Sequence, residues 1–108
     1  PITEFCRRHQ LDLEARLRLF LVVCEGVQHA HQRGVIHRDL KPSNVLVMER
    51  DGVPTPKIID FGLARALGDA SREAALTREG TLLGTLEYMS PEQADGDADI
   101  DIRADVYA

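Results

Sequence analysis

Three polar residues in the middle of the chain, Asp39, Asn44 and Asp60, could together support metal and proton chemistry. A carboxylate and an amide oxygen are hard ligands suited to Mg²⁺, which keeps waters and phosphate oxygens as its other ligands. Asn44 and Asp60 could supply such a pair. Asp39 would then be a spare carboxylate, able to accept a proton from an attacking hydroxyl group. This chemistry requires that the three side chains converge.

A β-hairpin is the element expected to bring them together. Residues 44–48 are short, apolar and partly β-branched, which predicts a strand. Residues 49–56 contain one glycine and two prolines and read as a turn region, and residues 57–59 form the returning strand. Antiparallel pairing brings the start of one strand beside the end of the other. Asn44 and Asp60 should therefore lie at the same end of the hairpin, where the loop carrying Asp39 also ends.

A long amphipathic helix is predicted before this hairpin, over residues 12–33, after a short helix over residues 3–8. Asp12 can cap the long helix and Gly34 can end it. Cys24 is expected to be a buried thiol because it falls within the apolar stripe. The stripe repeats at three- and four-residue steps and consists of Leu13, Leu17, Phe20, Leu21, Cys24, Val27, Gln28 and His31.

The bulk composition narrows the class of protein. A chain of 108 residues holds one domain at most, and its net charge of −5 argues against a nucleic-acid partner. No apolar run reaches the roughly 20 residues that span a bilayer. Two cysteines form no disulfide framework, which fits a reducing, cytoplasmic setting. The chain has no initiator Met and stops abruptly at Tyr107-Ala108, so we expect it to be part of a longer protein.

Three motifs in order carry a family resemblance. Residues 37–44, HRDLKPSN, match the catalytic-loop pattern H-R-D-L-x-x-x-N of protein kinases. Residues 60–62 match their D-F-G, and residues 90–92 match A-P-E with Ser in place of Ala. Each tripeptide alone is weak evidence, whereas the eight-residue loop is specific. The chain therefore resembles the serine/threonine protein kinases, and the wording around residues 87–93 is similar to bacterial members.

The resemblance implies a role for each residue that matches the motifs. Asp39 would be the catalytic base, and Lys41 would neutralise the transferring phosphate of ATP. Lys at this position is typical of serine/threonine kinases. The remaining roles are Mg²⁺ binding by Asn44 and Asp60, the floor of the adenine pocket by Leu46, and positioning of a Ser or Thr substrate by Thr85.

Regulatory and structural roles follow from the same resemblance. Arg38 would belong to a basic pocket for a phosphate on the activation loop, with Thr81 as the main phosphorylation site and Thr77 as the second candidate. Leu86 departs from the Pro often found after the Gly-Thr pair, which affects the shape of the substrate loop. Structural roles are implied for His37, Phe61 and Gly62, for a buried ion pair between Glu92 and Arg103, and for Asp105, which would bond back to the catalytic loop.

The predicted fold class is α+β, a partial protein-kinase-like fold in which residues 1–108 form part of the C-lobe. The predicted function is ATP- and Mg²⁺-dependent phosphorylation of Ser or Thr in proteins. Two alternatives remain open: a pseudokinase that acts as a scaffold, and a small-molecule phosphotransferase of kinase-like fold. The glycine-rich phosphate loop and the strand lysine of kinases are not in this sequence. We therefore expect the 108 residues alone to be inactive.

Overall fold

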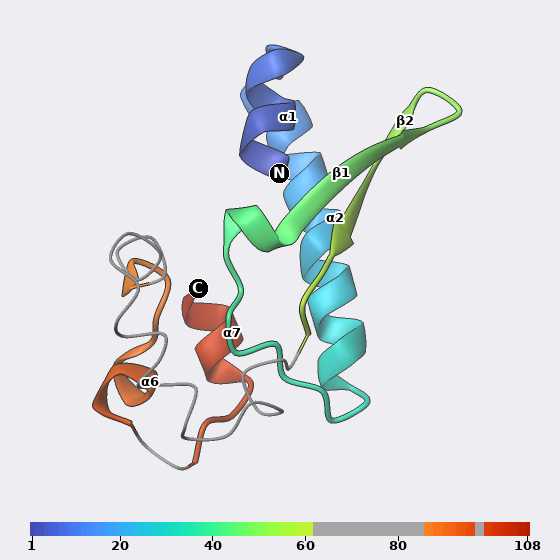
Figure 1. Ribbon diagram of the computed structural model, residues 1–108. Helices are drawn as coiled ribbons and strands as arrows, with labels where there is room; N and C mark the ends of the chain where they lie inside the picture. The colour runs from blue at the N-terminus through green and yellow to red at the C-terminus, as the bar shows by residue number, and fades with distance from the viewer. Residues whose placement is uncertain (62–85, 97–98) are drawn as a thin grey trace. The chain divides into compact units, whose positions relative to one another are not determined.

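The computed structural model describes residues 1–61, 86–96 and 99–108 (Figure 1). The chain divides into two compact units, which are Pro1–Gly34 with Pro42–Ile59, and Val35–Lys41 with Asp60–Ala108. Helices and a two-stranded antiparallel sheet make up the described elements, so the predicted α+β class is confirmed. Within the described ranges, no helix has the length and apolar character needed to cross a membrane.

Two helices begin the first unit, α1 over Ile2–Arg8 and α2 over Leu13–His31. The carboxylate of Asp12 accepts a hydrogen bond of 2.8 Å from the backbone N–H of Ala15, which satisfies one of the free donors of the first turn of α2. Gly34 follows α2 with a positive φ of 73° and donates to the carbonyl of His31 at 2.9 Å. The predicted long helix is thus confirmed, with both ends within two residues of their expected positions.

The predicted hairpin is also present, with longer strands and a tighter turn than expected. A short 3₁₀ helix, η1 (Pro42–Asn44), leads into β1 (Val45–Arg50), which pairs with β2 (Val53–Ile58). Only Asp51 and Gly52 form the turn, and both have positive φ, 52° and 76°. An Asp-Gly pair in this conformation matches the right-handed twist of the two strands, which explains why so short a connection suffices.

Two prolines in β2 made residues 49–56 resemble a loop, yet they fit this strand. Ile59 donates its backbone N–H to the carbonyl of Asn44 at 2.9 Å. Because hydrogen-bonding positions alternate along an antiparallel pair, the backbone N–H and C=O groups of the odd-numbered residues of β2 point toward β1. Pro54 and Pro56 occupy the even positions, opposite Glu49 and Val47. No N–H is needed at those positions, so the missing donors cost no ladder hydrogen bond.

The core of the first unit forms where α2 packs against β2 and where α1 packs against β1 and η1 (Figure 1). Its buried apolar residues are Cys6, Leu19, Val23, Val27 and Val45. Gly26 lies on the same side of α2, and a Cβ at this position would stand 3.4 Å from Cδ1 of Ile58. The small residue therefore allows the helix and β2 to approach closely.

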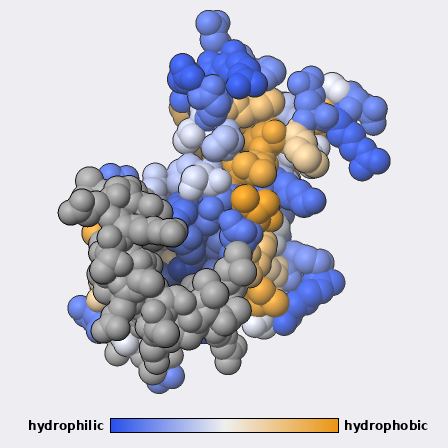
Figure 2. Space-filling model, viewed as in Figure 1, coloured by the Kyte–Doolittle hydropathy of each residue, from blue (hydrophilic) through white to orange (hydrophobic). Residues whose placement is uncertain are grey.

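The other apolar side of α2 is exposed, which corrects the predicted stripe. Figure 2 shows hydrophobic side chains running along this helix. Phe20 is 57% exposed, and Cys24 is exposed while Cys6 is the buried thiol. The helix is apolar on two sides, and only the side of Leu19, Val23 and Val27 is buried, where α2 packs against β2. The exposed large apolar residues of α2 are Leu13, Leu17, Phe20, Leu21 and Val22.

The second unit contains two short helices, α6 (Pro91–Asp95) and α7 (Arg103–Tyr107). Ser90 precedes α6 and is fully buried. The side-chain oxygen of Gln93 accepts hydrogen bonds from the backbone N–H and the hydroxyl of Ser90, at 3.2 Å and 3.1 Å. This return contact is the reciprocal part of a capping box and begins α6 at a defined residue.

Candidate active site

The loop of residues 37–41 places a carboxylate beside an ammonium group. The Nζ atom of Lys41 lies 2.9 Å and 3.1 Å from the two carboxylate oxygens of Asp39. The Lys41 side chain is 19% exposed and that of Asp39 is 35% exposed, so the pair is accessible but partly shielded from water. A carboxylate and an ammonium group are therefore held side by side. Transfer of a negatively charged group to a hydroxyl would use the carboxylate to accept the hydroxyl proton and the ammonium group to offset the negative charge.

A buried carboxylate holds the backbone just before this pair. The two oxygens of Asp105, at the start of α7, accept hydrogen bonds from the backbone N–H groups of His37 and Arg38, at 2.8 Å and 2.7 Å. Asp105 is 5% exposed and His37 is fully buried. Charge-assisted hydrogen bonds of this length are roughly twice as strong as neutral ones. The loop is thereby tied to a residue 68 positions away from His37 along the chain.

The backbone of Arg38 is held from its other side as well. Arg38 has a positive φ of 68°, a conformation that a residue with a side chain adopts only when its surroundings enforce it. Gln93, in α6, donates a hydrogen bond of 2.6 Å from its side-chain amide to the carbonyl of Arg38. Asp105 and Gln93 together hold the peptide groups on both sides of Arg38. These two contacts fix the direction of the backbone as it enters Asp39.

An aromatic contact extends this support to the segment that follows the hairpin. The ring of His37 lies 4.7 Å from that of Phe61, with the planes at 57°. The Nδ1 atom of His37 also accepts a hydrogen bond of 3.3 Å from the backbone N–H of Asp39. The imidazole is thus packed on one residue and bonded to another, as a residue that supports the loop would be.

The proposed metal ligands flank the hairpin in the sequence. Asn44 is 7% exposed and its carbonyl accepts the hydrogen bond from Ile59. Asp60 follows Ile59 directly, is exposed, and has a positive φ of 62°. Leu46 is half-buried in β1, opposite Lys57. Asn44 belongs to the first unit and Asp60 to the second, so a site shared by Asn44, Asp60 and Asp39 stays a prediction.

The expected buried ion pair between Glu92 and Arg103 is not what the structure shows. Arg103 instead pairs with Asp101 at 2.9 Å, and its side chain is 83% exposed. Asp101 also accepts the backbone N–H of Arg103 at 2.8 Å. The hydrogen bond from the Arg103 side chain lowers the pKa of the Asp101 carboxyl. Arg103 pairs with Asp101 because this carboxylate is only two residues away in the chain and reaches the guanidinium locally.

Comparison with known proteins decides the family. The family model described as the protein kinase domain matches residues 2–108. The chain belongs to the protein kinase family. Members of this family use ATP and Mg²⁺.

Bacterial protein kinases are among the similar proteins. The probable serine/threonine-protein kinase PknB of Corynebacterium glutamicum is 43% identical over 90 residues, which cover 83% of this chain and 13% of that protein. The serine/threonine-protein kinase PknB of Mycobacterium tuberculosis is 42% identical over 85 residues, covering 79% of this chain and 13% of that protein. The chain thus spans a small part of the length of the curated relatives that it matches.

One contact that holds the loop was not expected from the kinase motifs. Gln93 was not singled out from the sequence, although its amide binds both Ser90 and the carbonyl of Arg38. A signal was present, since Ser followed three residues later by Gln is a capping-box pattern. The pattern predicts the contact with Ser90. The contact with Arg38 joins residues 55 positions apart and requires the folded unit.

Several predicted site residues lie outside the described part of the chain. They are Gly62, Thr77, Thr81 and Thr85. Among the described residues, no group of three or more His, Cys, Asp or Glu side chains could hold a metal ion. A kinase site needs no such group, because an Asn amide, one carboxylate and phosphate oxygens suffice for Mg²⁺. The chemistry of Asn44 and Asp60 fits that requirement.

Proposed function

We propose that this chain supplies the phosphate-transfer part of a protein serine/threonine kinase. The observation that carries the proposal is the contact between Asp39 and Lys41 in a loop held by Asp105 and Gln93. The intact motifs and the names of the relatives support it. An ordered base and cation at this position are what the transfer step requires, and a scaffold would not need them.

In this proposal Asp39 accepts or orients the proton of the substrate hydroxyl as the oxygen attacks the γ-phosphate of ATP. Lys41 offsets negative charge on the transferring group, and Leu46 supports the adenine. Asn44 and Asp60 would hold Mg²⁺, and the ion would supply positive charge that offsets the negative charge of the phosphate groups. Thr85, which lies outside the described residues, would help to position the Ser or Thr substrate. The substrates are proteins, and the domain works in the cytoplasm, where ATP is available.

The decisive experiment replaces the base in the complete protein. Asp39→Asn keeps the size of the side chain but removes the proton acceptor, so we expect transfer of labelled γ-phosphate to a Ser/Thr peptide to fall by about 10²- to 10⁴-fold. Asp51→Asn is the matched control, because Asp51 lies in the exposed hairpin turn and Asn tolerates positive φ. A kinase rate within a few-fold of the parent for Asp39→Asn would contradict the proposal. So would transfer to small molecules alone.

A further inference from the structure

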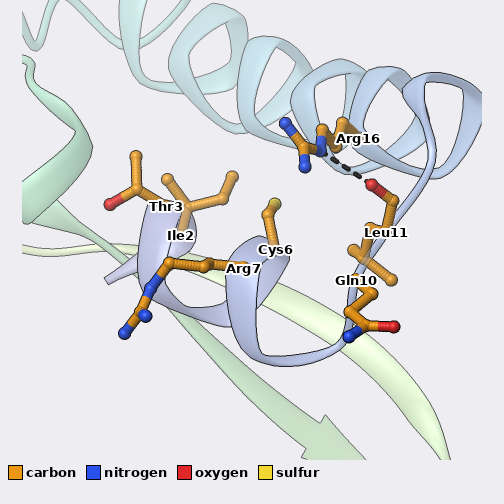
Figure 3. A pocket seen from close by; sticks show the side chains of 7 residues that line it. All are labelled: Ile2, Thr3, Cys6, Arg7, Gln10, Leu11 and Arg16. Atoms are coloured by element: carbon orange, nitrogen blue, oxygen red, sulfur yellow. Dashed lines mark hydrogen bonds between the residues drawn. The ribbon is translucent and has the colours of Figure 1, made fainter.

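A pocket between α1 and the start of α2 is separate in sequence from every residue proposed for phosphate transfer. Figure 3 shows the residues that line it, on α1, on α2 and between them. Its volume of about 660 Å³ is within the range of ligand sites. Ile2, Cys6 and Leu11 provide an apolar surface. Thr3 and Gln10 add a hydroxyl and an amide that can bond to a peptide backbone.

The charge at the pocket comes from one pre-oriented guanidinium. Arg16 donates from Nε to the backbone carbonyl of Leu11 at 2.9 Å, as the dashed line in Figure 3 shows. This bond fixes the plane of the group and leaves its two terminal nitrogens as donors. Arg16 forms no ion pair with any residue that the structure describes. A guanidinium held in this way is suited to bidentate contact with a carboxylate.

The second arginine at the pocket is already neutralised. Arg7 bonds to both oxygens of Glu4, at 2.9 Å and 2.7 Å. The hydrogen bond from Arg7 lowers the pKa of the Glu4 carboxyl, so this pair stays ionised at neutral pH and its charges cancel. Among the residues that line the pocket, Arg16 is therefore the charged side chain without an acidic partner, although the chain as a whole carries −5.

We propose that this pocket is a docking site for a peptide segment of a partner protein in which aliphatic and acidic residues alternate. The aliphatic side chains would lie on Ile2, Cys6 and Leu11, and a carboxylate would bind Arg16. Thr3 and Gln10 would bond to the peptide backbone. The site adds a recruitment surface to the proposed kinase, and it requires no step of phosphate transfer.

The test is a binding titration on the complete protein with a fluorescein-labelled nonapeptide in which leucine and aspartate alternate. We expect saturable binding that Arg16→Gln weakens about tenfold, because it removes a charge-assisted bidentate contact. Arg8→Gln is the matched control. It makes the same charge change on α1, outside the pocket, and should alter the affinity by less than about twofold. The peptide with asparagine in place of aspartate should bind about tenfold more weakly.

Other outcomes would overturn the docking proposal. These are equal losses for Arg8→Gln and Arg16→Gln, equal binding of the asparagine peptide, or no saturable binding up to about 1 mM. Arg16-dependent binding of octanoate without the peptide would indicate a small-molecule site. Arg16-dependent self-association without peptide binding would indicate a second copy as occupant. The titration needs no ATP, and Asp39→Asn should bind the peptide as the parent does, so failure here is distinguishable from failure of the proposed kinase activity.

Discussion

At the scale of single residues, the conformation of Arg38 depends on the buried carboxylate of Asp105. A residue with a side chain at positive φ costs about 1–2 kcal/mol relative to its ordinary conformation. Two short hydrogen bonds, which the backbone N–H groups of His37 and Arg38 donate to Asp105, offset that cost. The motif predicted that Asp105 would bond to the loop. Which two N–H groups it binds became visible only in the folded unit.

We expect Asp105→Asn in the complete protein to lower both stability and kinase activity. The amide can accept one of the two N–H groups, but its NH₂ would face the other and leave it without an acceptor, at a cost of about 1–3 kcal/mol. Thermal unfolding and phosphate transfer measure the two effects. Asp99→Asn is the control, because Asp99 is exposed. The role assigned to Asp105 would be wrong if the two variants unfolded at the same temperature.

The predicted phosphorylation switch is also a matter of single residues. We propose that Thr81 accepts the activating phosphate and that Arg38 pairs with it, because a phosphate adds up to about two negative charges that an arginine can bind. Thr81→Ala should lower the activity of the complete protein, and Thr77→Ala should do so less. Mass spectrometry after incubation with ATP should locate the phosphate. An unmodified Thr81 together with a fully active Thr81→Ala variant would refute the switch.

At the scale of elements, Gln93 joins the start of α6 to the catalytic loop. Its side-chain oxygen accepts a hydrogen bond from the backbone N–H of Ser90, and its NH₂ group donates one to the carbonyl of Arg38. These two functions can be separated by substitution, because a glutamate at this capping-box position can still accept from Ser90 but has no NH₂ group to donate.

We expect Gln93→Glu to lower the phosphate-transfer rate of the complete protein about tenfold, since the loss of one buried hydrogen bond is worth about 1 kcal/mol or more. Gln93→Ala should lower the rate similarly and lower the unfolding temperature further, because it also removes the cap. Gln28→Glu, on an exposed site of α2, makes the same chemical change as a control. Equal rates for Gln93→Glu and Gln28→Glu would show that the bond to Arg38 has no role in catalysis.

The two ends of α2 could be predicted from the sequence. The cap at Asp12 and the stop at Gly34 are local signals, because each depends on groups within three residues, and both ends of α2 were predicted from them. The extent of β2 was missed because Pro54 and Pro56 are turn signals in isolation. Only the register shows that both fall at positions without ladder bonds.

At the scale of the whole molecule, one apolar side of α2 is exposed, and no residue of the described part of the chain covers it. Leu13 and Leu21 are 72% and 61% exposed. Contiguous apolar surface of this kind promotes association in water. We expect the 108-residue chain alone to bind a hydrophobic dye and self-associate, and to show no measurable phosphate transfer, since it contains no glycine-rich phosphate loop.

Dye fluorescence and light scattering test this expectation against a complete kinase domain. Exchanging two exposed apolar residues, Leu17→Glu with Leu21→Lys, should reduce both signals in the short chain. The control reverses the exposed ion pair of the same helix, Glu14→Lys with Arg18→Glu, and should leave them unchanged. Equal dye binding by the short chain and the complete domain would contradict the prediction, as would normal phosphate transfer by the short chain.

The sequence by itself indicated the family, the catalytic motifs and the order of the two N-terminal helices, the loop and the hairpin, whereas the α6 helix (Pro91–Asp95) lies partly where a loop was expected. The family and the motifs are carried by residue types at short spacings, so Asp39, Lys41, Asn44 and Asp60 could be named before any fold was known. The tertiary structure decided which side of α2 is buried and that Gln93 reaches the loop. Those outcomes depend on groups that approach only after folding. A helix apolar on two sides cannot indicate which side will be covered, because the covering elements lie elsewhere in the chain.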